Sequence, residues 1–275
     1  MTRFFITALL LMVGLSAQLK IEVLKMQETP YNENAIIKKM YAETGVVGSK
    51  YPLVLQVGEF PIGVSVPNRP EWLKGMRENG NGSTILLWVY GENGFQKRFY
   101  LSQDDATSFV EDKTYFKDRF RKYFQSGDLP NELEGKKIAI TAILVNGYGE
   151  SLKIARATSL LTVDYMKKSD VDNGMLEKVL KGPRIYFNEP YGNYKVDQPI
   201  MVDYYVYNAD IGTDAYTVNL YIDGNLEEVL YDWAPYRVKN LMPGIHEFKL
   251  VLIDPKGKPV PDAFGEQKNY ISIGE

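Results

Sequence analysis

The feature that most constrains this chain is an alternation of side chains in its last third. Ile200, Val202, Tyr204 and Val206 occupy every second position of one run. A period of two residues, rich in β-branched and aromatic side chains, is typical of a β-strand with a buried face. The chain also has 45% apolar and 24% charged residues, which is the balance of a folded protein with a substantial core. We therefore expect a mainly β fold.

Turn signals divide the same region into short strands. Asp223-Gly224 separates the alternating runs 216–222 and 226–231. An Asp-Gly pair in this position predicts a β-hairpin, because glycine accepts the positive φ that such turns require. Residues 254–257, Asp-Pro-Lys-Gly, place Asp, Pro and Gly at the first, second and fourth positions of a type I turn. Further short strands are expected at 185–187, 235–241 and 270–273.

The only histidine, His246, follows a Pro-Gly pair and shares its parity with Phe248 and Leu250. This position favours a structural histidine at the start of a strand. Nucleophilic catalysis needs a base and an orienting group, and the chain offers a single imidazole for that purpose. With one histidine and no cysteine, a zinc site is also disfavoured.

The first half of the chain is less regular but is also rich in strand signals. Asn93-Gly94 predicts a hairpin between two of these strands. The strand candidates are residues 20–26, 53–66, 84–90, 95–101, 136–145 and 159–165.

One segment of the first half, residues 113–126, predicts a helix. Its aromatic residues recur at spacings of four and three, as on one face of a helix: Phe116, Phe120, Tyr123 and Phe124. The other face carries Lys117, Arg119 and Arg121. These three are candidates for phosphate binding, because basic side chains pair with phosphate oxygens. The alternative is a solvated helix face.

The first 17 residues have the order of a secretory signal peptide. Arg3 precedes an apolar run from 4 to 13, which small residues follow up to Ala17. A buried N-terminal helix is the alternative. We expect cleavage after Ala17, and no cysteine follows that could carry a lipid or form a disulfide. No later stretch is apolar for long enough to span a bilayer. The mature protein is therefore expected in the periplasm or outside the cell.

Two tandem immunoglobulin-like β-sandwich domains are the expected architecture. Residues 18–166 are assigned to the first domain, which carries the helix near 113–126. Residues 167–182 are polar, charged and without a period of two, so they are assigned to a linker. Residues 183–275 are assigned to the second domain, with about seven short strands, as in an immunoglobulin-like sandwich.

The sequence predicts no metal site, no cofactor and no catalytic centre. Asp170 and Asp172 have the spacing that opens a calcium loop, but Gly174 comes one residue too early and no acid closes the loop. The acid pairs at 104–105 and 227–228 fit a helix start and a hairpin rim. The net charge of −3 argues against nucleic acid as a partner, because phosphate backbones require clustered Lys and Arg.

Aromatic side chains of the last domain are the leading candidates for ligand contact: Tyr191, Tyr194, Trp233 and Tyr236. Exposed Tyr and Trp supply contact area at protein and sugar interfaces. We expect a non-catalytic protein that binds a protein or peptide in the cell envelope. A carbohydrate-binding module is the alternative. A third possibility is an enzyme whose acid pair only the fold brings together.

Several stretches of both domains match a recurring pattern. They are "IYFNEPYGNY", "VDYYVYNADIG", "VNLYIDGN", "DWAPYRVKNLMPGIHEFKLVLIDPKGKPV" and, in the first domain, "AILVNGYGESLK". On these residues the chain resembles secreted bacterial two-domain β-sandwich proteins that are commonly labelled phosphopeptide-binding proteins. The resemblance covers most of the last domain and the final third of the first, and it implies a phosphopeptide ligand.

The chain departs from this family at two places. Where the family usually has a Tyr-Ser-Arg-Pro-Lys-Gly run, residues 187–192 read Phe-Asn-Glu-Pro-Tyr-Gly, so both basic residues are missing. Where the family tends to have a histidine between a tyrosine and a glutamate, this chain has Gly149 between Tyr148 and Glu150.

Overall fold

A computed structural model describes most of the chain, and the fold is almost entirely β. It covers residues 20–27, 29, 33–42, 51–64, 69–77, 82–91, 95–101, 119–124, 128–133, 136–164, 181–261 and 264–274. Nowhere in these residues is there a helix of the length and apolar character needed to cross a membrane. The leader at 1–17 lies outside this part of the chain, so the signal peptide stays a prediction.

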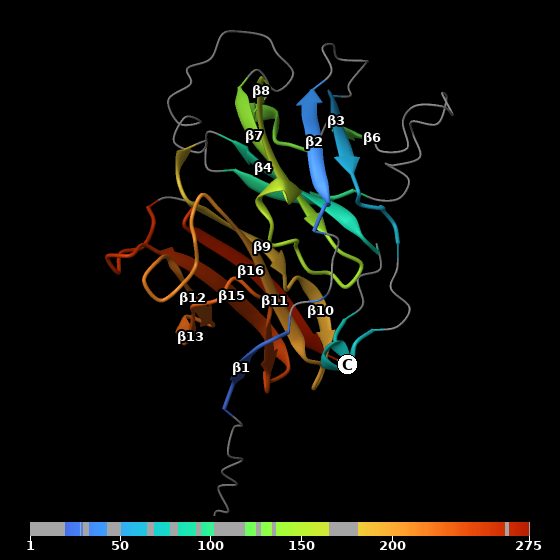
Figure 1. Cartoon of the computed structure of the whole chain (residues 1–275). Helices are drawn as coiled ribbons and strands as arrows, with labels where there is room; N and C mark the ends of the chain where they lie inside the picture. Colours follow the sequence, from blue (N-terminus) through green and yellow to red (C-terminus); the bar gives the residue numbers. More distant parts are fainter. Residues whose placement is uncertain are drawn as a thin grey trace, which may run out of the picture.

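The last third of the chain forms a sandwich of two sheets, here called the C-terminal sandwich (Figure 1). One sheet has the order β1-β14-β11-β9 and the other has the order β10-β16-β15-β12-β13. The strands are β1 (Glu22–Lys25), β9 (Arg184–Glu189), β10 (Gly192–Lys195), β11 (Ile200–Tyr207), β12 (Thr217–Ile222), β13 (Asn225–Leu230), β14 (Tyr236–Lys239), β15 (Gly244–Ile253) and β16 (Glu266–Gly274). The expected sandwich is therefore present.

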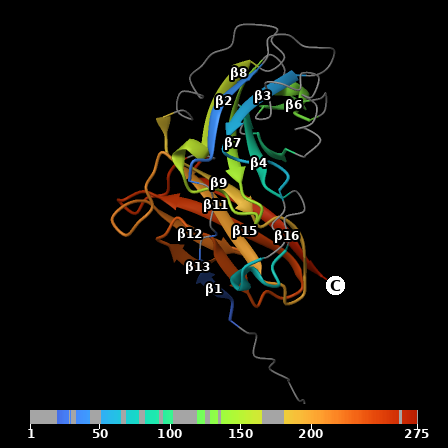
Figure 2. The same ribbon diagram turned by 45° about the vertical axis from the view of Figure 1, so that its right-hand side comes forward.

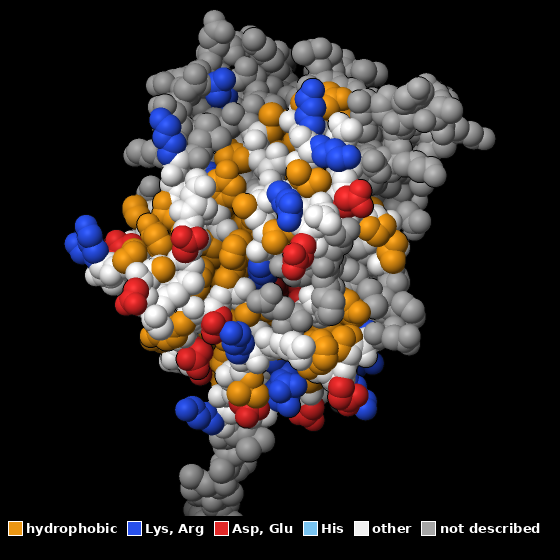
Figure 3. All heavy atoms as spheres, in the orientation of Figure 1, with side chains coloured by type: hydrophobic (Ala, Val, Ile, Leu, Met, Phe, Trp, Pro, Cys, Tyr) orange, Lys and Arg blue, Asp and Glu red, His pale blue; other side chains and the backbone are white. Residues whose placement is uncertain are grey.

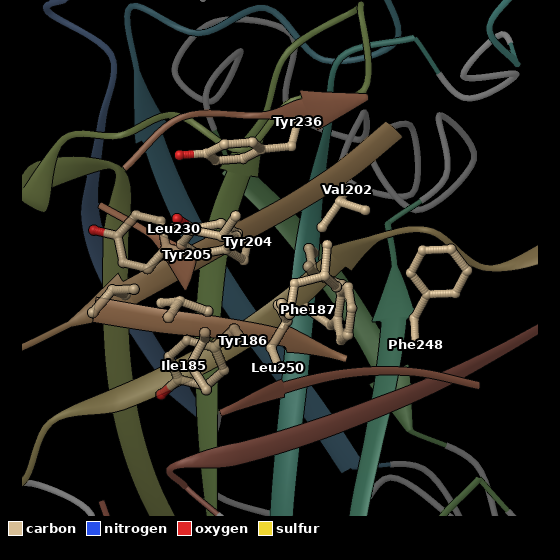
Figure 4. Packing of buried hydrophobic residues seen from close by; sticks show 14 of the residues in the cluster. Ile185, Tyr186, Phe187, Val202, Tyr204, Tyr205, Leu230, Tyr236, Phe248 and Leu250 are labelled. Atoms are coloured by element: carbon tan, nitrogen blue, oxygen red, sulfur yellow. The ribbon is translucent and has the colours of Figure 1, made fainter. Parts of the chain in front are cut away.

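The core between these sheets comes from the parity that the sequence predicts. Ile185 and Phe187 of β9 pack with Phe248 and Leu250 of β15, and all four are fully buried (Figure 4). Burial alternates along β16, as expected for a strand with one face in the core. His246 lies within β15 and is 9% exposed, which confirms its place in a strand.

The predicted turns at 223–224 and 254–257 are also confirmed, whereas the one at Asn93-Gly94 lies outside the described residues. Asp223 and Gly224 join β12 to β13 with φ values of 50° and 82°. The amide of Gly257 donates to the Asp254 carbonyl at 2.9 Å, which closes the turn at 254–257.

The earlier part of the chain forms a second pair of sheets, here called the N-terminal unit, with the orders β2-β3-β6 and β5-β4-β7-β8. Its strands are β2 (Ile36–Ala42), β3 (Tyr51–Gly58), β4 (Thr84–Gly91), β5 (Gln96–Tyr100), β6 (Arg119–Phe124), β7 (Lys137–Val145) and β8 (Thr158–Asp164). Leu53 and Leu55 of β3 share a buried cluster with Ile85 and Leu87 of β4. This unit stacks on the C-terminal sandwich in both ribbon views (Figures 1 and 2).

The helix expected at 113–126 is wrong where the structure describes it. Residues 119–124 form β6, which pairs antiparallel with β3 from Arg119 opposite Gln56 to Phe124 opposite Tyr51. Aromatic residues favour strands as well as helix faces, and a short isolated helix is only marginally stable, whereas a strand here pairs with β3. Residues 113–118, which include Lys117, lie outside the described chain.

The first described strand does not belong with its neighbours in sequence. β1 pairs antiparallel with β14, with Glu22 opposite Lys239, and so it is the outer strand of a sheet in the C-terminal sandwich. The sequence assigned this strand to the first domain, from residue 18 on, but in the structure it belongs to the C-terminal sandwich. Most of the expected linker, residues 167–180, lies outside the described chain, so that assignment stays a prediction.

β9 lies between the two units and is buried along its whole length. Ile185 and Phe187 face the core of the C-terminal sandwich, whereas Tyr186 faces the N-terminal unit. The Tyr186 ring lies 6.3 Å from that of Trp88 and 5.8 Å from that of Tyr90, both on β4. The two units are thus joined by a continuous buried cluster of side chains.

Candidate functional site

A groove of about 730 Å³ opens at the junction of the two units. One wall comes from β4 and β5 and the other from the first half of β16. We call it the junction groove, and its lining residues are Trp88, Gln96, Lys97, Arg98, Glu266, Gln267, Lys268 and Asn269. Its volume lies in the range that ligand-binding clefts occupy.

On the first side of the groove, β5 is the outermost described strand of its sheet. The Leu101 amide donates to the Ile85 carbonyl, and the Gly91 amide donates to the Phe95 carbonyl. Backbone groups of the odd-numbered residues of β5 therefore point toward β4. Because alternate residues of a strand direct their backbone groups to opposite sides, those of Arg98 point away from β4.

On the other side, β16 is covered along only part of its length. β10 pairs with the segment from Ile271 to Gly274, whereas residues 266–270 pair with β15 alone among the described strands. The Leu252 amide donates to the Gly265 carbonyl. Since backbone direction alternates, the backbone of Lys268 points away from β15. The junction groove therefore lies beside two strand edges with which no further described strand pairs.

The floor of the junction groove is polar and built from both units. Gln267 Nε2 donates to Gln96 Oε1 at 2.9 Å, and Asn269 Nδ2 donates to the Pro190 carbonyl at 2.9 Å. Gln267 is 3% exposed and Asn269 is 9% exposed. Trp88 Nε1 is buried without a hydrogen-bond partner among the described residues. The floor thus contains both satisfied amides and one unused donor.

Cations dominate the lining of the groove, with Lys97, Arg98 and Lys268 against the single carboxylate of Glu266. The Arg98 guanidinium lies 4.4 Å from the centre of the Tyr191 ring and donates to the Asn188 carbonyl at 3.3 Å. By contrast, acidic and basic side chains are interspersed over the described part of the face in Figure 3. The positive lining is therefore a local property of the groove.

Beside the groove, Arg77 organises a second cluster. Its Nη2 donates to both carboxylate oxygens of Glu189, each at 3.0 Å, and its Nη1 donates to the Tyr191 carbonyl. The guanidinium also lies 4.1 Å from the Tyr191 ring and 5.0 Å from the Tyr194 ring. Tyr100 stacks on Tyr191 at 5.4 Å. Tyr191 is thus held between Arg77, Arg98 and Tyr100.

Glu189 is deeply buried in this cluster. Burial raises its pKa to about 7, although the charge and hydrogen bonds of Arg77 offset part of that rise. The Tyr194 hydroxyl donates to Glu189 Oε2 at 3.1 Å. The cavity that touches Glu189 and Tyr194 holds only about 10 Å³, which is room for about one water molecule. Glu189 therefore lacks space for a substrate.

A polar network next to this cluster joins the two units. Lys153 and Asp203 form an ion pair in which both side chains are buried. Asp203 Oδ2 also accepts from the Ser151 amide at 2.8 Å and from Asn188 Nδ2 at 2.7 Å. Asn188 Nδ2 donates in addition to the Gly149 carbonyl at 2.6 Å. Gly149 and Asn188, which are far apart in the sequence, therefore lie side by side.

Glu150 connects Thr29, in the segment that follows β1, to this network through hydrogen bonds. Its Oε2 accepts from the Thr29 amide at 3.1 Å and from the Thr29 hydroxyl at 2.7 Å. Burial raises the pKa of Glu150 to about 7, and the hydrogen bonds from Thr29 offset part of that rise. Glu150 does not line the cavity beside Glu189. The two carboxyl groups with raised pKa values therefore do not share a reaction site.

The four aromatic residues that the sequence singled out fall into two groups. Tyr191 and Tyr194 lie with Arg77, whereas Trp233 and Tyr236 lie near Tyr204. Tyr194 is 4% exposed and Tyr236 is 5% exposed. β10 and β14 also belong to different sheets of the sandwich. The four residues do not form one flat exposed line.

Of the three basic candidates, Arg119 and Arg121 do not line the groove, and Lys117 lies outside the described residues. Arg119 and Arg121 lie in β6, opposite Gln56 and Val54 of β3. The cations that line the groove are Lys97, Arg98 and Lys268, and the sequence did not single out any of them. Gln96, Arg98 and Tyr100 occupy alternate positions and therefore lie on one face of the strand. This row of polar side chains was the only feature of the sequence that could have indicated Arg98 as a binding residue. It is equally typical of a solvated strand face.

No family model and no curated protein matches the chain. Solved structures with some similarity include fibronectin(III)-like modules of Clostridium thermocellum CbhA, with 12% identity and a TM-score of 0.27 over 33% of this chain and 96% of that one. A two-domain fibronectin type III segment of chicken tenascin has 10% identity and a TM-score of 0.25, over 86% and 99% of the two chains. A central fibronectin-III array of RIM-binding protein has 8% identity and a TM-score of 0.25, over 86% and 68%. At these scores the similarities carry no argument about function.

Proposed function

We propose that this chain is a non-catalytic binding protein that takes an extended peptide segment of a partner protein into the junction groove. The observation that supports this most is that β5 and residues 266–270 of β16 flank one groove, each with a side on which no described strand pairs. An exposed edge can accept a further strand through its backbone hydrogen bonds, and side-chain pockets then select the sequence.

The charge of the groove favours an acidic segment. Lys97, Arg98 and Lys268 outnumber Glu266 in the lining. Arg98 is fixed against Tyr191 and the Asn188 carbonyl, so less side-chain freedom is lost when an anion binds it. A peptide with acidic or phosphorylated side chains fits this lining, and a phosphorylated one agrees with the family that the chain resembles.

A cell-envelope partner is part of the proposal. The leader at 1–17 predicts export, and the absence of cysteine excludes a lipid anchor on a cysteine after the leader. A glycan partner finds less support, because Tyr194 and Tyr236 are buried and the candidate aromatic residues lie in two groups.

The test uses arrays of matched acidic, phosphorylated and neutral peptides, probed with the purified mature protein at two salt concentrations. We expect binding of acidic or phosphorylated peptides that weakens at high salt, because part of the attraction is between charges. The variant Lys268→Glu reverses one charge of the groove, and we expect it to weaken binding by about tenfold.

Lys195→Glu is the matched control. It makes the same charge change at an exposed residue of β10 that does not line the groove. Equal loss of binding in both variants, or no preference of the wild type for acidic peptides, would contradict the proposal. Binding of neutral peptides that Lys268→Glu leaves unchanged would show that the groove is not the site.

A further inference from the structure

Lys153 and Asp203 bring an amine and a carboxyl group into direct contact inside the protein. Lys153 lies in the connection between β7 and β8, and Asp203 lies in β11 of the C-terminal sandwich. Their side chains are 6% and 0% exposed, and Lys153 Nζ lies 2.5 Å from Asp203 Oδ1. Transfer of one proton across this contact turns two buried charges into two neutral groups, and burial disfavours charges. A neutral amine beside a neutral carboxylic acid is therefore within reach of the pair.

The backbone of β11 is irregular at the residue that carries the carboxyl group. Its register against β9 shifts between Asp203 and Tyr204. Irregularities of this kind re-aim a side chain and are common beside functional sites. Tyr204 belongs to the core of the C-terminal sandwich, whereas Asp203 contacts Ser151 and Lys153 of the N-terminal unit. The carboxyl group is thus directed across the junction between the two units.

The two oxygens of the Asp203 carboxyl group have different surroundings. Oδ2 accepts from the Ser151 amide at 2.8 Å and from Asn188 Nδ2 at 2.7 Å. Donors at these distances stabilise the negative charge that develops on a carbonyl oxygen when a nucleophile attacks its carbon. Oδ1 instead faces the Lys153 amine. One oxygen is therefore placed to take up charge, and the other is placed to receive a proton and leave.

The Lys153 amine is also fixed in position. Besides the carboxyl group, Nζ contacts Ser151 Oγ at 2.6 Å and donates to the Tyr204 carbonyl at 2.7 Å. Groups held in this way react without the loss of freedom that an encounter in solution requires. Burial also limits the access of water, which would otherwise solvate both charges. The site therefore combines a positioned nucleophile, a polarised carboxyl group and restricted access of solvent.

We propose that Lys153 and Asp203 condense to an intramolecular isopeptide bond that joins the two units. Lys153 Nζ passes one proton to Oδ1, and its free electron pair then attacks Cγ of Asp203. The Nζ–Cγ bond forms, the Cγ–Oδ1 bond breaks, and Oδ1 leaves as water with that proton and a second one from Nζ. The product is a neutral amide whose oxygen, Oδ2, keeps its two donors. The reaction is a dehydration, so it needs no oxidant, reductant or co-substrate.

Such a bond would give this chain a covalent cross-link of a kind that its sequence otherwise lacks. The chain has no cysteine, so it cannot form a disulfide. The two linked residues lie 50 positions apart in the sequence and belong to different units. Neither of them lines the junction groove, so the proposal does not depend on peptide binding.

The test is intact-mass spectrometry of the purified mature protein under denaturing conditions, after incubation at neutral pH until the mass is constant. We expect a mass below that of the sequence by one water molecule, because the condensation releases one. A protease digest should contain a branched peptide that joins Lys153 to Asp203. A mass equal to that of the sequence would overturn the proposal, since the two residues would then form an ion pair and nothing more.

A pair of variants assigns the loss of water to this site. Lys153→Arg keeps a positive charge but removes the amine, so we expect it to retain the full mass. Lys25→Arg is the matched control, because Lys25 pairs with Asp232 at 2.9 Å and both side chains are about half exposed. It should lose water as the wild type does.

Two results would contradict the assignment even if the wild type loses water. The Asp-Gly sequence at 223–224 can also lose water by cyclising, and that loss would persist in Lys153→Arg. A persistent loss in this variant, or a wild-type digest without the branched peptide, would overturn the proposal. Should Lys153→Arg fail to fold, the digest of the wild type still decides.

Discussion

Arg77 and Arg98 supply positive charge next to residues 187–192, a segment that has no basic residue of its own. Residues 189 and 191 are Glu and Tyr in this chain. The two arginines come from other segments and lie against Glu189 and Tyr191. The positive charge of this region therefore comes from residues distant in the chain, without any signal in the sequence around residue 190.

Glu150 and Glu189 make stability depend on pH. Each carboxyl has a pKa of about 7 in the folded protein and about 4.5 when unfolded. Between these values the unfolded chain loses a proton that the folded protein keeps. The free energy of unfolding therefore falls as the pH rises from about 4.5 to about 7, by on the order of 1 kcal/mol per pH unit for each group.

Glu150→Gln tests this directly. The amide oxygen can still accept from Thr29, but the group no longer titrates. We expect the slope of stability against pH to be about halved, because Glu189 still contributes. Urea unfolding at pH values from about 5 to about 8 measures it. Glu71→Gln, at an exposed residue, should leave the slope unchanged. A wild-type protein that gains stability over this range would contradict the assignment.

Among the elements, the hairpin of β12 and β13 depends on its backbone conformation. Gly224 has a φ of 82°, and a Cβ atom added there meets nothing within 4 Å. Gly224→Ala should therefore cost about 1 kcal/mol through backbone strain alone. Gly274→Ala is the control, because its Cβ also meets nothing and its φ is not left-handed. Equal midpoints of urea unfolding for the two variants would contradict this account.

Local elements of this fold could be predicted from the sequence, but their partners could not. The parity of β15 and the turns at 223–224 and 254–257 depend on neighbouring residues, which the sequence displays. β6 was mistaken for a helix because aromatic spacing fits both structures, and only the edge of β3 decides between them. The junction groove needs β5 and β16 side by side, although they lie far apart in the chain.

For the whole molecule, β9 joins the two units through buried contacts of Tyr186 with β4 and β7. The Tyr186 hydroxyl and Thr141 Oγ1 lie 2.8 Å apart, and both residues are fully buried. Tyr186→Phe should cost about 1–3 kcal/mol, because it leaves the Thr141 hydroxyl unsatisfied. Adding Thr141→Val should restore part of the loss.

The measurement is a double-mutant cycle on the free energy of unfolding. We expect a coupling energy of about 1 kcal/mol between the two residues. Tryptophan fluorescence and circular dichroism should report one common transition in the wild type, because the units share a core. Zero coupling, or two separate transitions, would show that the units are only loosely joined.

The position of β1 in the fold also limits when, during synthesis, this strand can join its sheet. β1 occupies residues 22–25, and its partner β14 occupies residues 236–239. The first described strand therefore cannot pair with β14 until residue 239 has been synthesised. Beyond the strand pairing, the Met26 amide donates to the Pro235 carbonyl, and Asn240 Nδ2 donates to the Lys20 carbonyl. This contact between distant parts of the chain therefore forms late in synthesis, after most of the other described strands have been made.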